Sequence, residues 1–341
     1  MNKWGFMTKI NKQVQLEQQP EGRPNEKDFR VVETETPSPR DGEFLAKNLF
    51  LSLDPYMRGA IAGKHMGHTR LNQGDLIGGR CVSEIIESNN STYKVGDRIV
   101  IESGWQEYVL SSGQKEHGIR IINKSRASLS ASLGVLGMPG LTSWAGVECL
   151  SKPTLGETFV VTAAAGPVGG TAGQLAKLKG AHVVGVAGSK EKCIVATDQY
   201  GFDACINYND ANWLDNLSKE CPKGIDVYFD NVGGLVLDQI SDQLNLYGRI
   251  ILCGFVSQYN NKEWHGHNLG KYVGKRANLL SVVVYDYYNR FDEFLNVAIP
   301  LVESGKMKFK EDTVIGIDSA PKHFSRLMAG ENVGKAVVEF G

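Results

Sequence analysis

The chain has 341 residues, a length that suggests two domains of ordinary size. Hydrophobic residues make up 42% and charged residues 22%, which is typical of a globular protein with a sizeable core. The 37 basic and 38 acidic side chains nearly cancel, and this argues against nucleic acid or an anionic membrane as the main partner. No apolar stretch reaches membrane-spanning length and no apolar signal core begins the chain, so we expect a cytoplasmic protein.

Residues 10–122 are predicted to be mainly β. Turns rich in Gly, Pro, Asp and Asn separate short alternating runs. These runs cover residues 14–16, 29–32, 44–51, 98–101 and 107–109. The pattern predicts a compact barrel-like or sandwich domain.

The character of the sequence changes at about Ser128. Two helical stretches, 128–136 and 141–150, lead into strands that alternate with helices such as 190–200 and 235–244. The expected strands are 159–163, 182–187, 204–207, 226–230, 249–254 and 279–284. This alternation predicts a doubly wound parallel sheet of the α/β class. After a long helix at 288–304, a short strand, a helix at 320–329 and a strand at 336–340 are expected to pack back on the first domain.

The most informative segment is AAAGPVGG, residues 163–170, directly after the apolar run 159–161. Gly166 and Gly169 fall on the second and third glycines of the G-x-G-x-x-G pattern, Ala164 stands at the first, and Pro167 and Val168 open a helix. Glycine allows the backbone to approach a pyrophosphate, and the helix N-terminus offers free N–H groups to its charge. The segment therefore predicts a dinucleotide-binding βα unit.

The next strand indicates which dinucleotide binds. An Asp or Glu about 20 residues after the glycines would hold the ribose hydroxyls of NAD, but Gly188 and Ser189 stand there, followed by Lys190 and Lys192. A hydroxyl and two ammonium groups without a carboxylate favour a 2′-phosphate, and hence NADP(H). Alternatively, Ser189 is only a helix N-cap and the lysines are solvated.

Several segments in order resemble those of one superfamily. They are LFLSLDPYMRG (49–59), GMPGLTSWAG (137–146), AAAGPVGG, GSKEK (188–192), INY (206–208), FDNVGG (229–234), GRIILCGFVSQYN (248–260), VVVYDY (282–287) and GENVGKAVV (330–338). The chain resembles the medium-chain dehydrogenases/reductases, and within them the zinc-free NADPH-dependent alkenal and enone double-bond reductases. That group includes prostaglandin reductases, plant double-bond reductases and curcumin reductases. The least typical segment is 63–79, which borders the substrate pocket in relatives.

The resemblance implies an architecture and an activity. A GroES-like substrate domain would comprise residues 1–135 and 309–341, and a Rossmann domain binding NADP(H) would comprise 136–308. A homodimer joined through the cofactor-domain sheets is also implied. The activity would be the reduction of the double bond of α,β-unsaturated ketones or aldehydes, small-molecule substrates. Two alternatives remain: a zinc-free NADPH quinone oxidoreductase, and an NADPH-binding sensor or structural protein without turnover.

The resemblance also implies which residues bind the cofactor. Gly188, Ser189 and Lys192 would hold the 2′-phosphate, and Tyr208 would line the same side. Other expected contacts come from strand ends and flanking segments, namely Met138, Thr142, Gly166, Pro167, Val168, Gly169, Asn231, Cys253, Gly254, Phe255, Tyr259, Val283, Val284 and Asn332. For Asn231 and Asn332 the alternative is a turn-forming role, because each precedes Val-Gly and asparagine is common in turns.

Reduction of an enone leaves negative charge on the carbonyl oxygen, which a hydrogen-bond donor can stabilise. Tyr259 and Tyr56 are the candidate catalytic donors, although both are equally well explained as packing tyrosines. Arg58 either faces the substrate or caps a strand end. We expect no metal: the six cysteines form no C-x-x-C pair, Gly-His-Glu is absent, and the pairs His65/His68 and His265/His267 lack the further ligands of a tetrahedral zinc site.

Overall fold

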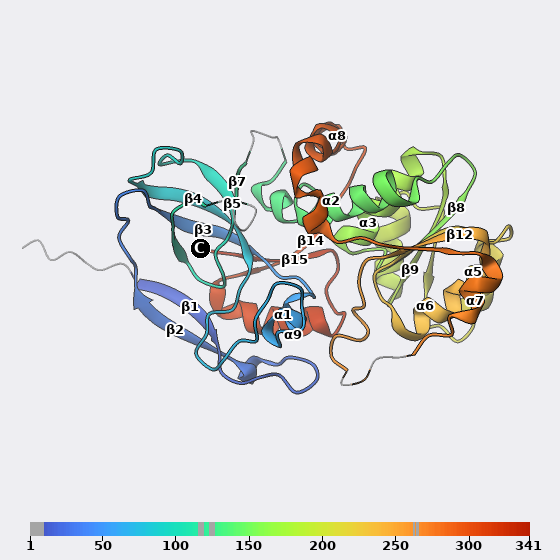
Figure 1. Cartoon of the computed structure of the whole chain (residues 1–341), viewed down its shortest axis with the longest axis horizontal. Helices are drawn as coiled ribbons and strands as arrows, with labels where there is room; N and C mark the ends of the chain where they lie inside the picture. The colour runs from blue at the N-terminus through green and yellow to red at the C-terminus, as the bar shows by residue number, and fades with distance from the viewer. Residues whose placement is uncertain (1–9, 115–118, 123–126, 262, 264–265) are drawn as a thin grey trace, which may run out of the picture. The chain divides into compact units, whose positions relative to one another are not determined.

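The computed structural model describes residues 10–114, 119–122, 127–261, 263 and 266–341. The chain divides into two compact units, coloured along the chain in Figure 1. Unit 1 comprises residues 1–124, 313–329 and 336–341, and unit 2 comprises 125–312 and 330–335. Among the described residues, no helix is both long and apolar enough to cross a membrane.

Unit 1 is built from antiparallel strands. Strands β1 (Ile10–Leu16) and β2 (Phe29–Glu35) pair with each other. The larger sheet has the order β14-β15-β3-β4-β5-β7, and β6 pairs with β3. Its strands are β3 (Phe44–Ser52), β4 (Arg80–Ser88), β5 (Arg98–Glu102), β6 (Tyr108–Ser111), β7 (Arg120–Ile121), β14 (Glu311–Ile315) and β15 (Lys335–Glu339).

The core of unit 1 includes an aromatic cluster that anchors its C-terminal helix. Phe324, on α9 (Ala320–Met328), packs edge-on against Trp105 with the ring centroids 5.5 Å apart, and Phe29 stacks on the same indole at 5.6 Å. All three side chains are buried. The sequence pattern does not predict β4, because Arg80, Glu84 and other polar residues interrupt its apolar ones. Pairing with β3 and β5 makes it a central strand.

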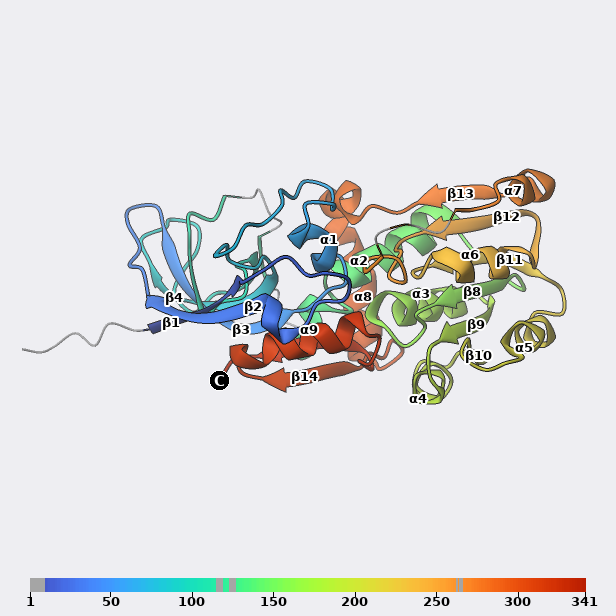
Figure 2. The same ribbon diagram turned by 90° about the horizontal axis from the view of Figure 1, so that it is seen from below.

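Unit 2 contains a six-stranded parallel sheet in the order β10-β9-β8-β11-β12-β13, and Figure 2 shows the strands in this order from β13 to β10. The strands are β8 (Thr158–Thr162), β9 (His182–Ala187), β10 (Ala204–Asn207), β11 (Ile225–Asp230), β12 (Leu244–Leu252) and β13 (Asn278–Ser281). The helices are α2 (Met138–Trp144), α3 (Pro167–Leu178), α4 (Lys190–Ile194), α5 (Trp213–Glu220), α6 (Gly234–Ser241), α7 (Gly270–Lys275) and α8 (Phe291–Glu303).

Apolar residues on both faces of the sheet account for the layered architecture of unit 2. Phe159 and Val161 of β8 belong to a core with residues of α2, α3 and α8, whereas Val160 belongs to a second core with residues of α5, α6 and α7. Successive side chains of a strand point to opposite faces, so an uninterrupted apolar run buries both. The prediction of a doubly wound α/β sheet and a separate, mainly β domain is confirmed.

Some predicted elements end elsewhere. The strand expected at 279–284 ends at Ser281, and a 3-10 helix begins at Val284. The neighbouring strand β12 ends at Leu252, which is the register partner of Ser281. The Val282 N–H still donates to the Leu252 carbonyl, but beyond this bond β13 has, among the residues that the structure describes, no strand to pair with at this edge. The helices expected at 141–150 and 190–200 are each a short α-helix followed by a π-helical turn.

Candidate cofactor site

The carboxyl ends of the parallel strands of unit 2 meet at one edge of the sheet. β8 comes first in the chain, and the strands that follow it lie on both sides, β9 and β10 on one and β11 to β13 on the other. In an open α/β sheet this reversal leaves a crevice at the carboxyl edge, where ligands bind. Four groups of predicted cofactor-binding residues follow strand ends and so lie on this edge: 166–169 after β8, 188–192 after β9, Asn231 after β11 and 253–255 after β12.

The glycine-rich turn has the geometry that its sequence predicts. Ala163 adopts a positive φ of 53°, and Gly166 is the N-cap of the 12-residue helix α3. A Cβ on Gly169 would overlap the carbonyl oxygen of Ala163, so the third glycine allows the helix to approach the strand. Ala164 stands at the position of the first glycine of the pattern. Its methyl group has room because the residue opposite it on β9 is Gly185: a Cβ on Gly185 would lie only 2.7 Å from that methyl.

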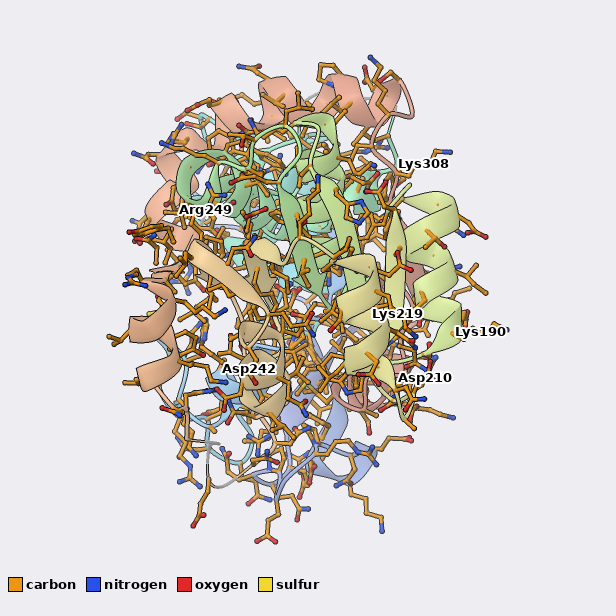
Figure 3. All side chains as sticks on the ribbon, turned by 90° about the vertical axis from the view of Figure 1, so that its right-hand side faces the viewer. Lys190, Asp210, Lys219, Asp242, Arg249 and Lys308 are labelled. Carbon is orange, nitrogen blue, oxygen red and sulfur yellow. The ribbon has the colours of Figure 1, made fainter. Side chains whose placement is uncertain are left out.

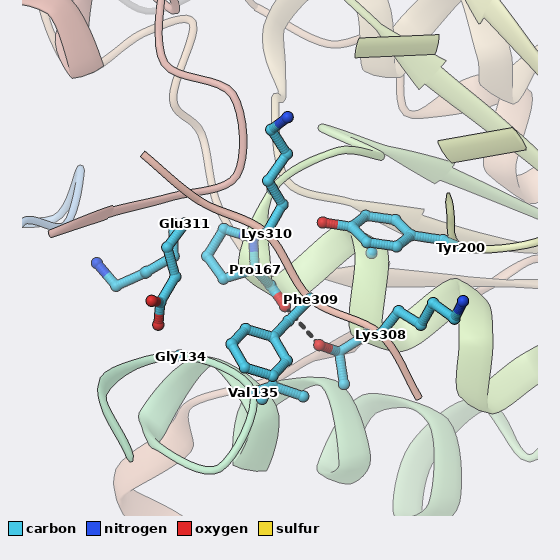
Figure 4. Close-up of a pocket in the computed structure, with 12 residues that line it drawn as sticks. Gly134, Val135, Pro167, Tyr200, Lys308, Phe309, Lys310 and Glu311 are labelled. Atoms are coloured by element: carbon cyan, nitrogen blue, oxygen red, sulfur yellow. Dashed lines mark hydrogen bonds between the residues drawn. The ribbon is translucent and has the colours of Figure 1, made fainter. Parts of the chain in front are cut away.

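A small cavity lies behind the turn, between Pro167 and the segment 308–311 (Figure 4). Its volume of about 10 Å³ is that of one water molecule, so it is not a substrate pocket. Gln174 of α3 exchanges two hydrogen bonds with the backbone of Lys308, at 2.8 and 2.7 Å. The segment is therefore bonded to α3, the helix that follows the glycine-rich turn.

The predicted 2′-phosphate residues gather at the end of β9. Ser189 is the N-cap of α4 and accepts a hydrogen bond from the Lys192 backbone N–H at 3.3 Å. A Cβ on Gly188 would lie 2.8 Å from the Tyr208 hydroxyl, so glycine brings that hydroxyl close to the backbone. Capping uses one lone pair of Ser189 and leaves its hydroxyl proton, so the capping and phosphate-binding interpretations are compatible.

The two lysines of α4 have different surroundings. The Lys192 ammonium donates to the carbonyl of Gly330 at 2.5 Å and is partly buried. Burial lowers its pKa, and Glu191, Asp312 and Glu331 act in the opposite direction. Lys190 is exposed and points outward at the surface of unit 2 (Figure 3). Lys192 is therefore the lysine with a fixed position.

Asn231 follows β11 and crosses to β8. Its backbone N–H donates to the Thr162 hydroxyl at 2.8 Å, and its side-chain amide donates to the Thr162 carbonyl at 2.8 Å. Among the described residues, no hydrogen bond uses its Oδ1, which stays available as an acceptor. Thr162 and Asp230, which fix this turn, were not singled out by the sequence analysis. The segment FDNVGG contains Asp230, but only the assembled sheet brings Thr162 to it.

The turn after β12 carries the next predicted group. The N–H groups of Cys253 and Gly254 donate to the Asp230 carbonyl at 2.9 and 3.2 Å, and the Phe255 N–H donates to the Tyr259 hydroxyl at 3.3 Å. Burial raises the pKa of Cys253 to about 12, and burial also raises the pKa of Tyr259. Tyr259 is therefore a phenol, and a hydrogen-bond donor, over the neutral range.

The remaining cofactor candidates of unit 2 lie in three places. Thr142 donates its hydroxyl to the Met138 carbonyl at 2.8 Å within α2. Asn332 donates its amide to the Gly334 carbonyl at 2.8 Å, which is a turn-forming role. Val283 and Val284 follow β13 rather than end it, which corrects their predicted position.

Unit 1 contains Tyr56 in a cluster of rings. Its ring centroid lies 4.8 Å from that of His65 and 6.1 Å from that of His68, and the imidazoles are 5.3 Å apart. Burial and the neighbouring His68 lower the pKa of His65. Arg58 is buried and donates to the carbonyls of Pro20 and Gly22, each at 3.0 Å. Its guanidinium therefore holds a loop of unit 1.

A parallel sheet with a dinucleotide-type turn, together with an antiparallel β unit, fits the class of two-domain dinucleotide-dependent oxidoreductases. Comparisons with known proteins agree. Residues 12–119 match the family described as the N-terminal domain of oxidoreductase, and residues 167–302 match the family described as zinc-binding dehydrogenase. The chain belongs to the medium-chain dehydrogenase/reductase superfamily, in the group of NADP-dependent alkenal and enone reductases.

Individual relatives match over nearly the full chain. The present chain is 39% identical to an NADPH-dependent curcumin reductase of Escherichia coli, and the match covers 98% of each chain. It is 38% identical to a 2-alkenal reductase (NADP(+)-dependent) of Nicotiana tabacum, covering 96% of this chain and 97% of the relative. Among solved structures, CurA from Vibrio vulnificus in complex with NADPH superposes with a TM-score of 0.91 at 36% identity, covering 97% and 99% of the two chains. The predicted family is confirmed.

The zinc in the second family description does not fit the donor set of this chain. Cys81 is fully buried in β4, its thiol lies 3.6 Å from the Gly104 carbonyl, and burial raises its pKa well above the usual range, which disfavours the thiolate that zinc requires. His267 pairs with Asp238 at 3.0 Å, and His265 lies outside the described residues. Within the described part of the chain, no three His, Cys, Asp or Glu side chains form a metal-binding group.

Proposed function

We propose that this chain is an NADPH-dependent reductase of the carbon–carbon double bond of α,β-unsaturated aldehydes and ketones. The observation that carries the proposal is the end of β9, where Ser189 and Lys192 stand with Gly188 in place of a ribose-binding carboxylate. The names of the full-length relatives, a curcumin reductase and a 2-alkenal reductase, support the substrate class.

The residues fit NADP(H) along the carboxyl edge of unit 2. The backbone N–H groups at the start of α3 would bind the pyrophosphate, since the first turn of a helix has no internal partners for them. Ser189, Lys192 and Tyr208 would hold the 2′-phosphate. Asn231 and the turn 253–255 would border the nicotinamide half. When bound, the cofactor supplies a hydride.

The chain itself must stabilise the charge that develops on the substrate oxygen. A phenol can donate a hydrogen bond to an enolate oxygen and needs no metal. Tyr259 suits this role, because its raised pKa keeps the proton on the oxygen and its hydroxyl already accepts from the Phe255 N–H. Tyr56 of unit 1 is the second candidate, and the half-buried rings of His65 and His68 beside it would narrow the range of substrates.

The test is steady-state oxidation of NADPH with three acceptors: 2-nonenal, curcumin and a benzoquinone. We expect turnover of the alkenal or the dienone, with the saturated carbonyl compound identified by mass spectrometry. Turnover of the quinone alone would overturn the proposal in favour of a quinone oxidoreductase. Tight NADPH binding without turnover over a wide enone panel would indicate a sensor or structural protein. We also expect a homodimer, to be measured by light scattering.

A further inference from the structure

A carboxylate is completely buried at the edge where the cofactor would bind. Asp230, the last residue of β11, has no exposed surface. Its Oδ1 accepts hydrogen bonds from the Tyr228 hydroxyl at 2.7 Å, the Thr162 hydroxyl at 3.1 Å and the N–H groups of Val232 and Gly233 at 3.1 Å. Its Oδ2 accepts a second bond from the Gly233 N–H at 3.0 Å. Burial of a charge is costly unless donors surround it in this way.

The same residue connects the turns that follow three strands. Its carboxylate holds the Thr162 hydroxyl at the end of β8, and that hydroxyl in turn accepts from the Asn231 N–H. Its backbone carbonyl accepts from the Cys253 and Gly254 N–H groups after β12. Beyond these contacts, the 231–232 backbone accepts from the N–H groups of residues 256 and 257, at 3.4 and 3.2 Å. Turns 231–234 and 253–257 are thereby joined.

The turn held by Asp230 has an unusual backbone. Gly233 and Gly234 both have positive φ, at 70° and 60°, a region that side chains rarely adopt. A Cβ on Gly233 would lie 2.5 Å from the Phe255 ring, so turn 231–234 approaches turn 253–257 closely. A flexible glycine pair keeps one conformation only when other groups hold it, and the Gly233 N–H is bonded to both carboxylate oxygens of Asp230.

We propose that Asp230 is a positioning residue for the nicotinamide half of the cofactor. Its carboxylate holds Thr162 and the turn 231–234. Through the hydrogen bonds that join this turn to turn 253–257, it keeps Asn231 and the backbone from Cys253 to Phe255 in their cofactor-facing positions. This inference rests on the cofactor assignment of the proposed function. Asp230 does not touch the cofactor: it acts through the two joined turns. The Lys192 end of the site, after β9, makes no described hydrogen bond to Asp230 and should be independent of it.

The strand offers a matched control at its other end. Asp226 accepts from the Thr158 N–H at 2.9 Å and from the Asn245 amide at 2.7 Å, so it too joins neighbouring strands through its carboxylate. It lies at the start of β11, away from the carboxyl edge. The substitutions Asp230→Asn and Asp226→Asn each replace an oxygen acceptor by an amide donor. Only the first alters the turns at the carboxyl edge.

The experiment compares two probes by titration calorimetry. NADPH carries both halves of the cofactor, whereas 2′,5′-ADP contains the adenosine half with its 2′- and 5′-phosphates and lacks the nicotinamide half. For Asp230→Asn we expect the Kd of NADPH to rise about tenfold or more, because small displacements of positioning groups have effects of this size. The Kd of 2′,5′-ADP should stay within about twofold, the error of such comparisons. Asp226→Asn should leave both values unchanged.

A purely structural role would lower the thermal midpoint without separating the two probes. Equal weakening of both probes by Asp230→Asn, or no weakening of NADPH, would overturn the inference. If that variant does not fold, Tyr228→Phe removes one donor and keeps the carboxylate, and it must show the same selective loss of NADPH affinity. If wild-type protein binds NADPH but reduces no enone, the proposed function fails while the Asp230 inference is still judged by the two dissociation constants.

Discussion

The substitution Lys192→Ala tests the choice of cofactor most directly. The Lys192 ammonium donates to the Gly330 carbonyl at 2.5 Å, and the Lys192 backbone N–H donates to the Ser189 hydroxyl that caps the same helix after β9. A 2′-phosphate bound there would gain a charge-assisted hydrogen bond that the ribose hydroxyl of NADH cannot match. We therefore expect the variant to lose efficiency with NADPH far more than with NADH.

The size of the effect follows from two contacts. Hydrogen bonds to charged groups contribute about 1.5–3 kcal/mol, so loss of the phosphate contact should lower kcat/KM for NADPH by about 10- to 100-fold. Loss of the bond to the Gly330 carbonyl loosens the segment 330–335 for both cofactors. This bond also has a charged donor, but its loss should affect the two cofactors alike, so the ratio of kcat/KM for NADPH to that for NADH should still fall by about 10- to 100-fold.

The assay is kcat/KM with each cofactor at saturating enone, for wild type, Lys192→Ala and the matched control Lys190→Ala. Lys190 belongs to the same helical turn but is exposed, so its removal should change either value by less than about twofold. Equal losses with NADPH and NADH in Lys192→Ala would refute the 2′-phosphate assignment. So would an effect of Lys190→Ala as large as that of Lys192→Ala.

Three further predictions concern the turn, the proton donor and stability in acid. Gly169→Ala should destabilise the protein by about 1–3 kcal/mol in chemical denaturation, because its Cβ would overlap backbone oxygens of the preceding turn, whereas Gly274→Ala, which has open space, should not destabilise it. Tyr259→Phe should lower kcat about 100-fold, and wild-type kcat should show no tyrosine ionisation below pH 10, because burial raises the pKa of Tyr259 above its ordinary value of 10.0. An unchanged kcat would make it a packing tyrosine. Burial raises the pKa of Glu157, but hydrogen bonds from the Arg249 side chain and the Thr154 backbone N–H lower it by more than burial raises it, so the folded-state pKa lies below 4.5. The stability it contributes is present above the unfolded-state pKa and is lost as the pH falls through the folded-state value. Glu157→Gln should therefore flatten the acid end of the stability profile, and an unchanged slope would contradict this.

The sequence alone predicted the class of fold and the turn of the nucleotide site. The apolar run 159–161 buries both faces of β8, and a run without alternation is typical of a strand in a parallel sheet. The glycine-rich turn after β8 could be predicted because the contacts that require its glycines are local: Gly166 and Gly169 each approach backbone oxygens only a few residues earlier in the chain. The N-cap role of Ser189 is local as well.

Contacts between distant segments were decided only by the tertiary structure. Lys192 finds its partner at Gly330, 138 residues further on, and Asp230 binds Thr162, 68 residues earlier. The end of β13 at Ser281 depends on where β12 ends, although Val282 to Val284 are apolar residues that favour a strand. Strand order and register arise from burial of the whole sheet, and local patterns do not encode them. The sequence therefore predicted which residues follow the strands at the carboxyl edge, while the network around Asp230 became visible only once β8, β11 and β12 lay side by side.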